Sequence, residues 1–460
     1  MLKKTTIILG LLSQFVFAQN NIVIYNNDLA LISENKTINI QQGNSEINYE
    51  NVSSQIIKDS VAVKFPSQVS VFEQNYRYNL INFSSILKHT VGKKIKFLVD
   101  NKNNKKTTIK TGILLSNNNP ILIQEKEVST GNKGNIFVVE AKNIQFIDLP
   151  KNMTSKPSLV WKIKSLKQYL DFPLSMQYLS RGFSWKSNYV FSLEDNRLQL
   201  NSWITLNNNS EMKLTDFNLT LLAGEVNQIK PNVYRKDRRN YEMMALSKAQ
   251  DIEPKALMGF YTYKIPFKVN IEPKSQKQIS FLQKEVQSFK FINKFNLNNQ
   301  KRDFKGRFIK SLKFSNTEKN GVGVPLPGGI ARVYKKNNLN ENFFIGESTI
   351  KNTPITEEVE LILGEDFNSS IDAKVVKYTN NKYQAKINYE IIIKNNSKEN
   401  MIYKILANEN VSHYRAFKFS SNCKNECSSI KNSVGNYDLT VMVKKNSEFL
   451  LKIEKEYTKQ

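Results

Sequence analysis

Cysteine and histidine are nearly absent from this 460-residue chain, which has two of each. The histidines, His89 and His413, stand far apart, and neither has another candidate ligand at a metal-binding spacing. A multi-histidine zinc site and a serine–histidine–aspartate site both need a histidine beside further functional side chains. The scarcity of histidine therefore disfavours both kinds of site, and we predict no bound metal and no cofactor.

The two cysteines lie close together in the sequence, at Cys423 and Cys427. Two neighbouring cysteines in an oxidising compartment usually form a disulfide, although a loop this short gains only ~2 kcal/mol from the bridge. Free thiols, or a metal or redox role, are the alternatives. A catalytic dithiol usually has two intervening residues at the start of a helix, whereas this segment has three and no helical pattern. We therefore expect a Cys423–Cys427 disulfide.

Long apolar runs are missing except at the N-terminus. Lys3 and Lys4 are followed by a mostly apolar stretch that ends at Ala18. A positive start, a short apolar run and a small residue before the cut are typical of a secretory signal peptide, and the run is shorter than the ~20 residues of a membrane span. We predict that residues 1–18 are removed, that the mature protein is periplasmic or secreted, and that it has no integral membrane span. An uncleaved anchor is the alternative.

Acidic residues are outnumbered, with 41 Asp and Glu against 67 Lys and Arg, so the net charge is +26. Most of the positive charge is lysine, and it is spread along the chain in short clusters such as 102–106 and 235–239. A nucleic-acid-binding protein concentrates arginine and aromatic residues on one face. We therefore expect no specific nucleic-acid partner, but a weak affinity for anionic surfaces.

Alternation of apolar and polar residues dominates the sequence from residue 21 onward, with turn residues between the alternating runs. This pattern predicts a mainly β protein of several antiparallel β-sandwich units with little helix. We expect an N-terminal mainly-β domain at 19–150, a central β-sandwich region at 157–369 and a C-terminal immunoglobulin-like sandwich at 370–460.

Two segments break the alternation. Residues 81–91 place Ile86, Leu87 and Val91 at helical spacing before Gly92, which predicts a short helix. Residues 235–259 are charged and lack periodicity, so we predict a mobile insertion there.

The most distinctive short motif runs from Gly182 to Trp185. One interpretation makes Trp185 and Tyr189 aromatic platforms for a ligand; the other, which we favour, turns Trp185 into the sandwich core, where such folds commonly hold a tryptophan. Glu225 is a candidate acid, but a single carboxylate without a partner does not define a mechanism. The glycine-rich tract at 321–329 lacks the Lys-Ser/Thr of a phosphate loop and predicts a β-turn.

An ordered set of motifs in residues 157–460 resembles a bacterial secreted family known by its domain of unknown function 4139. The set comprises PSLVW at 157–161, YLSRGFSWKSNY at 178–189, LAGEVN at 222–227, FYTY at 260–263, PLPGGIARVY at 325–334, GE at 346–347 and LGE at 363–365. The stretch 24–31 and the turn at 91–94 resemble the domain that precedes it in related proteins. Some relatives are described as mucoidy-inhibitor-like and insert a coiled coil, which this chain lacks. The resemblance implies an exported β-sandwich protein and transfers no catalytic residue.

These observations favour an exported, non-catalytic envelope interaction or structural protein whose partner is an envelope protein or a glycan. The alternative is a periplasmic hydrolase or carbohydrate-active enzyme that uses an unidentified carboxylate site, since pairs of acids that meet in space are invisible in a sequence. A deep pocket lined by Glu225 and other acids would favour the enzyme, whereas a flat surface would favour the binding protein.

Overall fold

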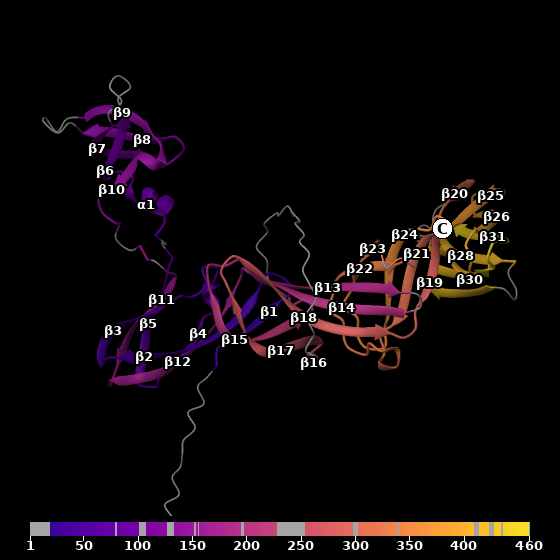
Figure 1. The fold of residues 1–460 in the computed structure, drawn as a ribbon, viewed down its shortest axis with the longest axis horizontal. Coiled ribbons are helices and arrows are strands. Elements are labelled where there is room, and N and C mark those ends of the chain that lie inside the picture. The colour runs from indigo at the N-terminus through magenta and orange to yellow at the C-terminus, as the bar shows by residue number, and fades with distance from the viewer. Residues whose placement is uncertain are drawn as a thin grey trace, which may run out of the picture.

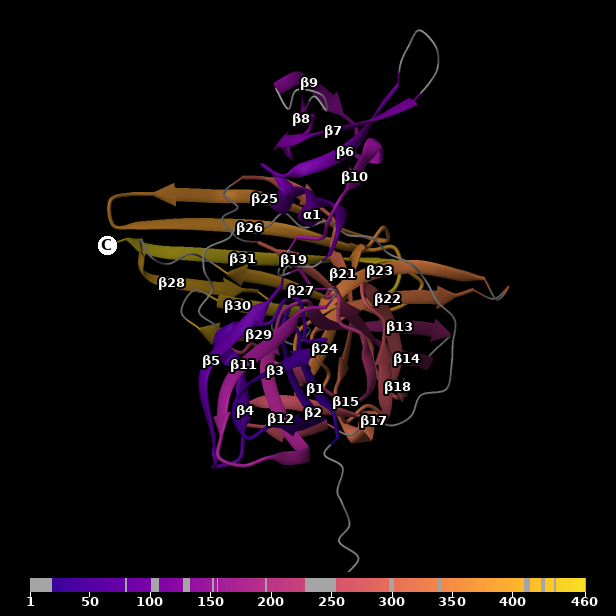
Figure 2. The same cartoon turned by 90° about the vertical axis from the view of Figure 1, so that its left-hand side faces the viewer.

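The computed structural model of the chain is mainly β, with several antiparallel sheets and little helix, which confirms the expected fold class (Figures 1 and 2). The structure describes residues 19–78, 81–100, 107–126, 133–150, 153–154, 156–194, 197–227, 254–297, 302–337, 339, 341–408, 414–422, 427–433 and 436–459. The signal peptide expected at 1–18 lies outside these ranges.

A seven-stranded sheet joins segments that are far apart in the sequence. In sheet order its strands are β16 (Pro254–Leu257), β17 (Phe260–Ile271), β15 (Leu214–Ala223), β1 (Asn21–Tyr25), β2 (Ala30–Ile40), β12 (Tyr169–Ser180) and β4 (Ala62–Lys64). β1 pairs with β15 in parallel and with β2 antiparallel, and β2 pairs with β12. The strands at 21–40 therefore belong to the same sheet as strands of the expected central region, and the sheet crosses the boundary expected at residue 150.

A three-stranded sheet packs beside these strands. Its order is β3 (Gly43–Glu50), β11 (Ser158–Ser165) and β5 (Val69–Arg77), with all pairs antiparallel. The 3-10 turn η1 (Lys58–Ser60) lies in the connection before β4. β2 continues into β3 and β11 into β12 through short connections, so each of these two chain segments supplies one strand to each sheet.

A small unit stands apart from the rest of the molecule (Figure 1). It contains α1 (Phe83–Thr90), η2 (Ala141–Asn143) and a five-stranded antiparallel sheet in the order β10 (Ile144–Phe146), β6 (Lys94–Asp100), β7 (Thr107–Ser116), β8 (Ile121–Lys126) and β9 (Lys133–Val139). Leu87 of α1 packs with Ile95, Phe97 and Leu114 in a core of its own. The helix expected at 81–91 is confirmed: Asn82 caps its N-terminus by accepting a hydrogen bond from the Ser85 N–H, and Gly92 follows its end with φ +80°.

The middle and the C-terminal end of the molecule are built from three further sheets (Figures 1 and 2). The first has the order β18 (Ser275–Val286), β14 (Arg197–Asn208), β13 (Phe183–Glu194), β22 (Gly329–Lys336) and β23 (Asn342–Ile350). The second has the order β24 (Glu358–Glu365), β21 (Ile309–Ser315), β19 (Lys290–Asn296), β27 (Met401–Asn408), β30 (Asn436–Val443) and β29 (Cys427–Ser433), and the third β20 (Phe304–Gly306), β25 (Ser369–Asn380), β26 (Gln384–Asn395), β31 (Ser447–Lys459) and β28 (Tyr414–Ser421). The turn η3 (Glu318–Asn320) follows β21.

Residues 370–460 contribute strands to both layers of a C-terminal sandwich, with buried side chains such as Ile391, Tyr403 and Leu439 between the layers. The seven strands β25–β31 divide into four (β25, β26, β31, β28) and three (β27, β30, β29), the division of an immunoglobulin constant-type domain. The order differs at two places: the seventh strand, β31, and the fifth strand, β29, have exchanged the positions that they hold in that domain. Strands from before residue 370 extend both layers, so the sandwich also crosses its expected N-terminal boundary.

The insertion expected at 235–259 lies for the most part outside the described residues. Its last part is ordered as a strand: β16 pairs with β17, and Met258 and Gly259 form the turn between them with positive φ. The Cys423–Cys427 disulfide also stays a prediction, because Cys423 lies outside the described ranges and only the backbone of Cys427, at the start of β29, is described. The part of the chain that the structure describes contains no disulfide.

We predict that Gly329→Ala will destabilise the protein and that Gly328→Ala will not. The parallel pairing of β13 with β22 begins at Gly329, where an added Cβ would lie 2.2 Å from the carbonyl oxygen of Ser187. At Gly328 the nearest atom would be 3.3 Å away, the side-chain oxygen of Asn352. Because overpacking typically costs about 1–3 kcal/mol, thermal denaturation should show a lower melting temperature for Gly329→Ala alone. Equal melting temperatures would contradict the close strand approach.

Candidate functional site

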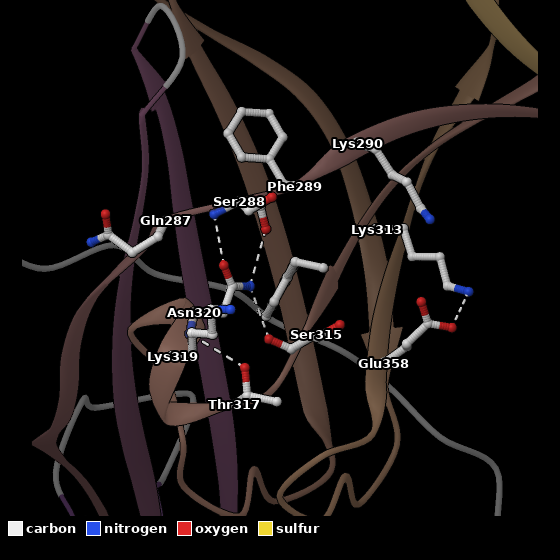
Figure 3. Close-up of a pocket in the computed structure, with 11 residues that line it drawn as sticks. Gln287, Ser288, Phe289, Lys290, Lys313, Ser315, Thr317, Lys319, Asn320 and Glu358 are labelled. Atoms are coloured by element: carbon white, nitrogen blue, oxygen red, sulfur yellow. Dashed lines mark hydrogen bonds and ion pairs between the residues drawn. The ribbon is translucent and has the colours of Figure 1, made fainter.

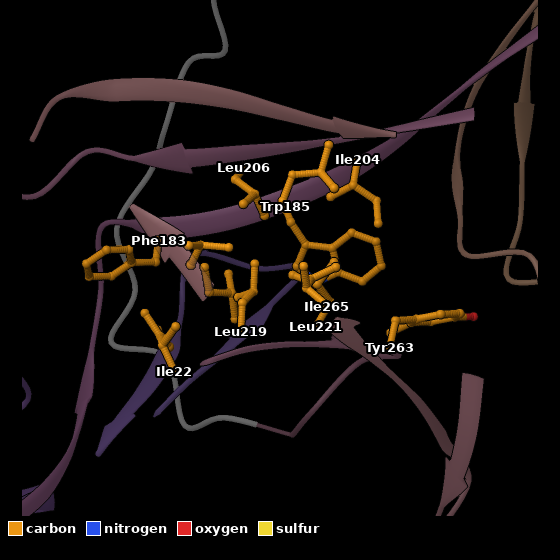
Figure 4. Close-up of a cluster of buried hydrophobic side chains, with 14 of the residues drawn as sticks. Ile22, Phe183, Trp185, Ile204, Leu206, Leu219, Leu221, Tyr263 and Ile265 are labelled. Atoms are coloured by element: carbon orange, nitrogen blue, oxygen red, sulfur yellow. The ribbon is translucent and has the colours of Figure 1, made fainter. Parts of the chain in front are cut away.

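Trp185 lies in the core of the molecule. Its ring is fully buried among side chains of β1, β14, β15 and β17, including Leu206, Leu221 and Ile265 (Figure 4). The indole N–H donates a hydrogen bond of 3.3 Å to the backbone oxygen of Leu222, and the ring meets Tyr263 edge-on at 6.2 Å. The expected core position of Trp185 is therefore confirmed, and a role as a surface platform does not fit this burial.

Tyr189 lies four residues after Trp185 on β13, on the same face of the strand, and is also fully buried. Its hydroxyl donates a 2.6 Å hydrogen bond to the backbone oxygen of Pro327, and burial raises the pKa of this hydroxyl well above its usual value. The bond ties the turn at 325–329 to the sheet. Tyr189 is thus a core residue, and its interpretation as a ligand platform is wrong for the same physical reason as that of Trp185.

Glu225 follows the end of β15 and is exposed. The structure describes neither a hydrogen bond nor an ion pair of its carboxylate with another described residue. Among the residues that the structure describes, no group of three or more histidine, cysteine, aspartate or glutamate side chains is arranged to hold a metal ion. The geometry therefore supplies Glu225 with no described partner for acid–base chemistry.

A buried carboxyl that the sequence did not single out lies between the two layers near the N-terminus. Glu34 of β2 is only 5% exposed, and one of its oxygens accepts a 3.3 Å hydrogen bond from the Tyr178 hydroxyl of β12. Desolvation raises the pKa of Glu34 to about 7, against the opposing influence of Lys36 and of the Tyr178 hydrogen bond. The nearby Lys36 ammonium lies 3.9 Å above the Tyr49 ring and donates to the backbone oxygen of Glu50.

An open hollow of about 460 Å³ lies where β18 passes into β19, beside the end of β21, η3 and the start of β24 (Figure 3). Its rim and walls carry Lys290, Lys313 and Lys319 together with Phe289 and a single acid, Glu358. Lys313 forms an ion pair with Glu358, whereas the structure describes no ion pair of Lys290 or Lys319 with any described residue. The hollow therefore has a net positive charge.

The amide group at the base of this hollow has a structural role. Asn320 accepts a 2.6 Å hydrogen bond from the Ser288 N–H and donates to the backbone oxygens of Ser288 and Ser315 (Figure 3). These bonds join the β18–β19 connection to the β21–η3 turn, while the structure describes no acidic partner for the ammonium groups of Lys290 and Lys319. The hollow is therefore suited to electrostatic attraction of an anion. Its residues come from separate stretches of unremarkable lysine-rich sequence, so no local signal could have identified it.

We predict that Trp185→Ala will lower the free energy of unfolding by about 3–5 kcal/mol, because it removes a fully buried ring from a packed core. Chemical denaturation of the mature protein measures this change. Tyr383→Ala is the matched control, since Tyr383 is 72% exposed at the turn between β25 and β26 and should cost little stability. A Trp185→Ala protein as stable as the control would contradict the core position.

We predict that Glu34 makes the protein more stable in mild acid than at alkaline pH. Its folded pKa of about 7 lies above the unfolded value near 4.5, so the folded state holds the proton more tightly. The proton on Glu34 therefore contributes roughly 3 kcal/mol to the free energy of unfolding below about pH 4.5. This contribution is lost as the pH rises to about 7. Urea unfolding of wild type and Glu34→Gln from pH 4.5 to 8 should show this decline in wild type beyond that of the variant. Parallel profiles of the two proteins would refute the assignment.

Comparisons with protein families and with curated proteins identified no relative of this chain. No protein-family model matches the chain, and no curated protein matches it in sequence at a significant level. In the part of the chain that the structure describes, no helix is long and apolar enough to span a membrane. The candidate sites are therefore interpreted from their own residues.

Proposed function

We propose that the chain is an exported, non-catalytic protein that binds a component of the cell envelope, and that it belongs to the family with domain of unknown function 4139. The observation that carries this proposal is the combination of an elongated row of sheets (Figure 1) with an open, positively charged hollow where β18 passes into β19 (Figure 3). Such a scaffold offers broad solvent-facing sheet surfaces, and lysine ammonium groups attract anionic polymers and surfaces.

The proposed location rests on the N-terminal sequence. Lys3, Lys4, the apolar stretch and Ala18 form the pattern of a cleaved signal peptide, and an oxidising compartment would also suit the proposed Cys423–Cys427 bridge. Envelope components outside the cytoplasm include anionic polymers, which suits a net charge of +26. The ordered motifs at 157–334 support the family assignment.

The mature protein should begin at Gln19 and appear in the periplasmic fraction or the medium. Edman sequencing or peptide mass mapping of protein purified from its native host will identify the first residue. Recovery of an intact Met1 in the membrane fraction would contradict cleavage and export.

The mature protein should co-sediment with purified envelope material, and the sedimented fraction should fall as salt screens the lysines. Lys290→Gln with Lys319→Gln should weaken this binding several-fold, because the double change removes the two ammonium groups of the hollow that have no described acidic partner. Lys255→Gln with Lys268→Gln makes the same change of net charge on exposed positions of β16 and β17 and is the matched control. Wild-type protein that stays in the supernatant at low salt would refute the proposed function. An equal loss of co-sedimentation in both double variants would show that the hollow has no special part in envelope binding.

A further inference from the structure

The outer face of the sheet β18-β14-β13-β22-β23 differs from the rest of the surface. Alternate residues of these strands, such as Phe191, Ile204 and Val333, point into the main core. Along β13 and β14 the residues between them are half-buried or exposed, apart from the buried Thr205, and belong to no core cluster. The five strands that carry them are neighbours in one sheet in the middle of the molecule (Figure 1).

Strand register places the side chains of this face in rows. One row contains Ser280, Trp203, Asn188 and Ile330; the next contains Gln283, Asn201, Val190 and Arg332; and the third contains Glu285, Gln199, Ser192 and Tyr334. We call these three rows the amide face. Side chains that are paired across neighbouring strands lie about 5 Å apart. Amide, hydroxyl and aromatic groups are therefore close neighbours on this face, together with two aliphatic side chains and one charge of each sign.

The amide face is nearly free of charge in a strongly basic protein. The chain has 67 lysines and arginines, yet the three rows contain no lysine, and their one cation, Arg332, forms a 2.9 Å ion pair with Glu347 of β23. Glu285 accepts a 2.8 Å hydrogen bond from Gln199. An anionic ligand would find little attraction here, because the one cation is already paired with Glu347. A neutral polar ligand would meet mostly uncharged groups.

Two aromatic side chains are available to a ligand on the amide face. Trp203 is half-buried, and its indole N–H makes no hydrogen bond to a described residue. Tyr334 is half-buried as well, lies against Phe344 with ring centroids 5.6 Å apart, and its hydroxyl has no described partner. Two strands and four residues separate Trp203 from Tyr334, which is roughly 16 Å on the sheet surface. The span suits an extended chain of several rings.

Amide groups with free bonding capacity lie beside Trp203, with Asn201 two residues before it on β14 and Gln283 opposite Asn201 on β18. The structure describes no hydrogen bond from the side chains of Asn201 or Gln283, so each offers two donors and an acceptor. Asn188, by contrast, donates to the Thr205 hydroxyl over 2.8 Å and is held in place. A ligand that carries many hydroxyl groups could both donate hydrogen bonds to the free amide oxygens and accept them from the free amide N–H groups.

We propose that the amide face binds a neutral glycan. The apolar face of a sugar ring would lie on Trp203, since aromatic rings bury apolar surface while their polar edge stays bonded, and sugar hydroxyls would exchange hydrogen bonds with Asn201 and Gln283. This inference deepens the proposed function by naming a ligand class and rests on it, although it concerns a different surface from the basic hollow.

Tryptophan fluorescence provides a selective assay. The chain has three tryptophans, and Trp161 and Trp185 are both fully buried, so Trp203 is the one that solvent reaches. Mature protein would be titrated with four probes: hexasaccharides of β-1,4-glucose, α-1,4-glucose and β-1,4-N-acetylglucosamine, and an anionic hexauronate. We expect at least one neutral hexasaccharide to change the emission and to protect it from acrylamide quenching, with the hexauronate binding at least tenfold more weakly.

Variants test the face directly, with calorimetry as a second readout. Trp203→Ala should raise the dissociation constant at least tenfold and Trp203→Phe should restore part of the affinity, whereas Tyr383→Ala, an exposed aromatic on a distant sheet, should bind as wild type does. Gln283→Lys should also weaken binding, and because Gln283 is exposed this variant should fold even if Trp203→Ala does not.

The outcomes separate this inference from the proposed function. No binding of any neutral hexasaccharide, or unchanged affinity in both Trp203→Ala and Gln283→Lys, overturns the glycan face, even when wild type sediments with envelope material. If the protein binds a neutral glycan but never sediments with envelope material, glycan binding by the amide face is supported and the proposed envelope function is refuted. Preference for the hexauronate would assign the binding to the lysines instead.

Discussion

The position of the N-terminal hairpin β1–β2 in the middle of the seven-stranded sheet is the constraint on which most of the molecule depends. β1 lies between β15 and β2, and β2 lies between β1 and β12, so this hairpin closes the gap between strands that are otherwise not neighbours. Ile22, Ile24 and Ile32 are fully buried in the same core as Trp185. Without the hairpin, two groups of strands would expose unpaired edges and lose one wall of their shared core.

This long-range pairing also explains the elongated shape. One continuous core connects the seven-stranded sheet, the three-stranded sheet, the sheet around β13 and part of the sheet around β21, and a second core begins where β19 and β27 pair in parallel. Phe291 contacts both cores. The basic hollow lies at this transition, because the connection from β18 to β19 must bend there and Asn320 holds the bend in place.

The two faces of each sheet carry different kinds of side chain. Inner positions hold large aromatic and aliphatic side chains, and outer positions of the C-terminal sheets hold cross-strand ion pairs such as Lys452–Glu390 and Lys394–Glu448. The amide face departs from this rule, since its outer positions carry amides, hydroxyls and two aromatic rings. Exposed ion pairs contribute little to stability, so their replacement by amides costs the fold little and changes which ligand the surface can bind.

The sequence by itself determined the local structure. Strict alternation identified strands such as β13 and β26 because a half-buried strand must place apolar residues on one side. The helical spacing of Ile86, Leu87 and Val91 before Gly92 identified α1, because a helix repeats its apolar face every three to four residues and a glycine commonly ends it. The motif at Gly182–Trp185 indicated a core tryptophan for similar local reasons.

Only the tertiary structure decided which strands pair and which surfaces face solvent. The pairing of β1 with β15 joins residues that are nearly 200 positions apart, and no local pattern encodes a partner at that distance. Hence the expected boundaries at 150 and 370 did not match the sheets. Trp203 and Trp185 have similar strand environments in the sequence, yet one faces solvent and the other the core, because a single-residue step along a strand reverses the face. The hollow and the amide face share this origin: register and packing bring their residues together.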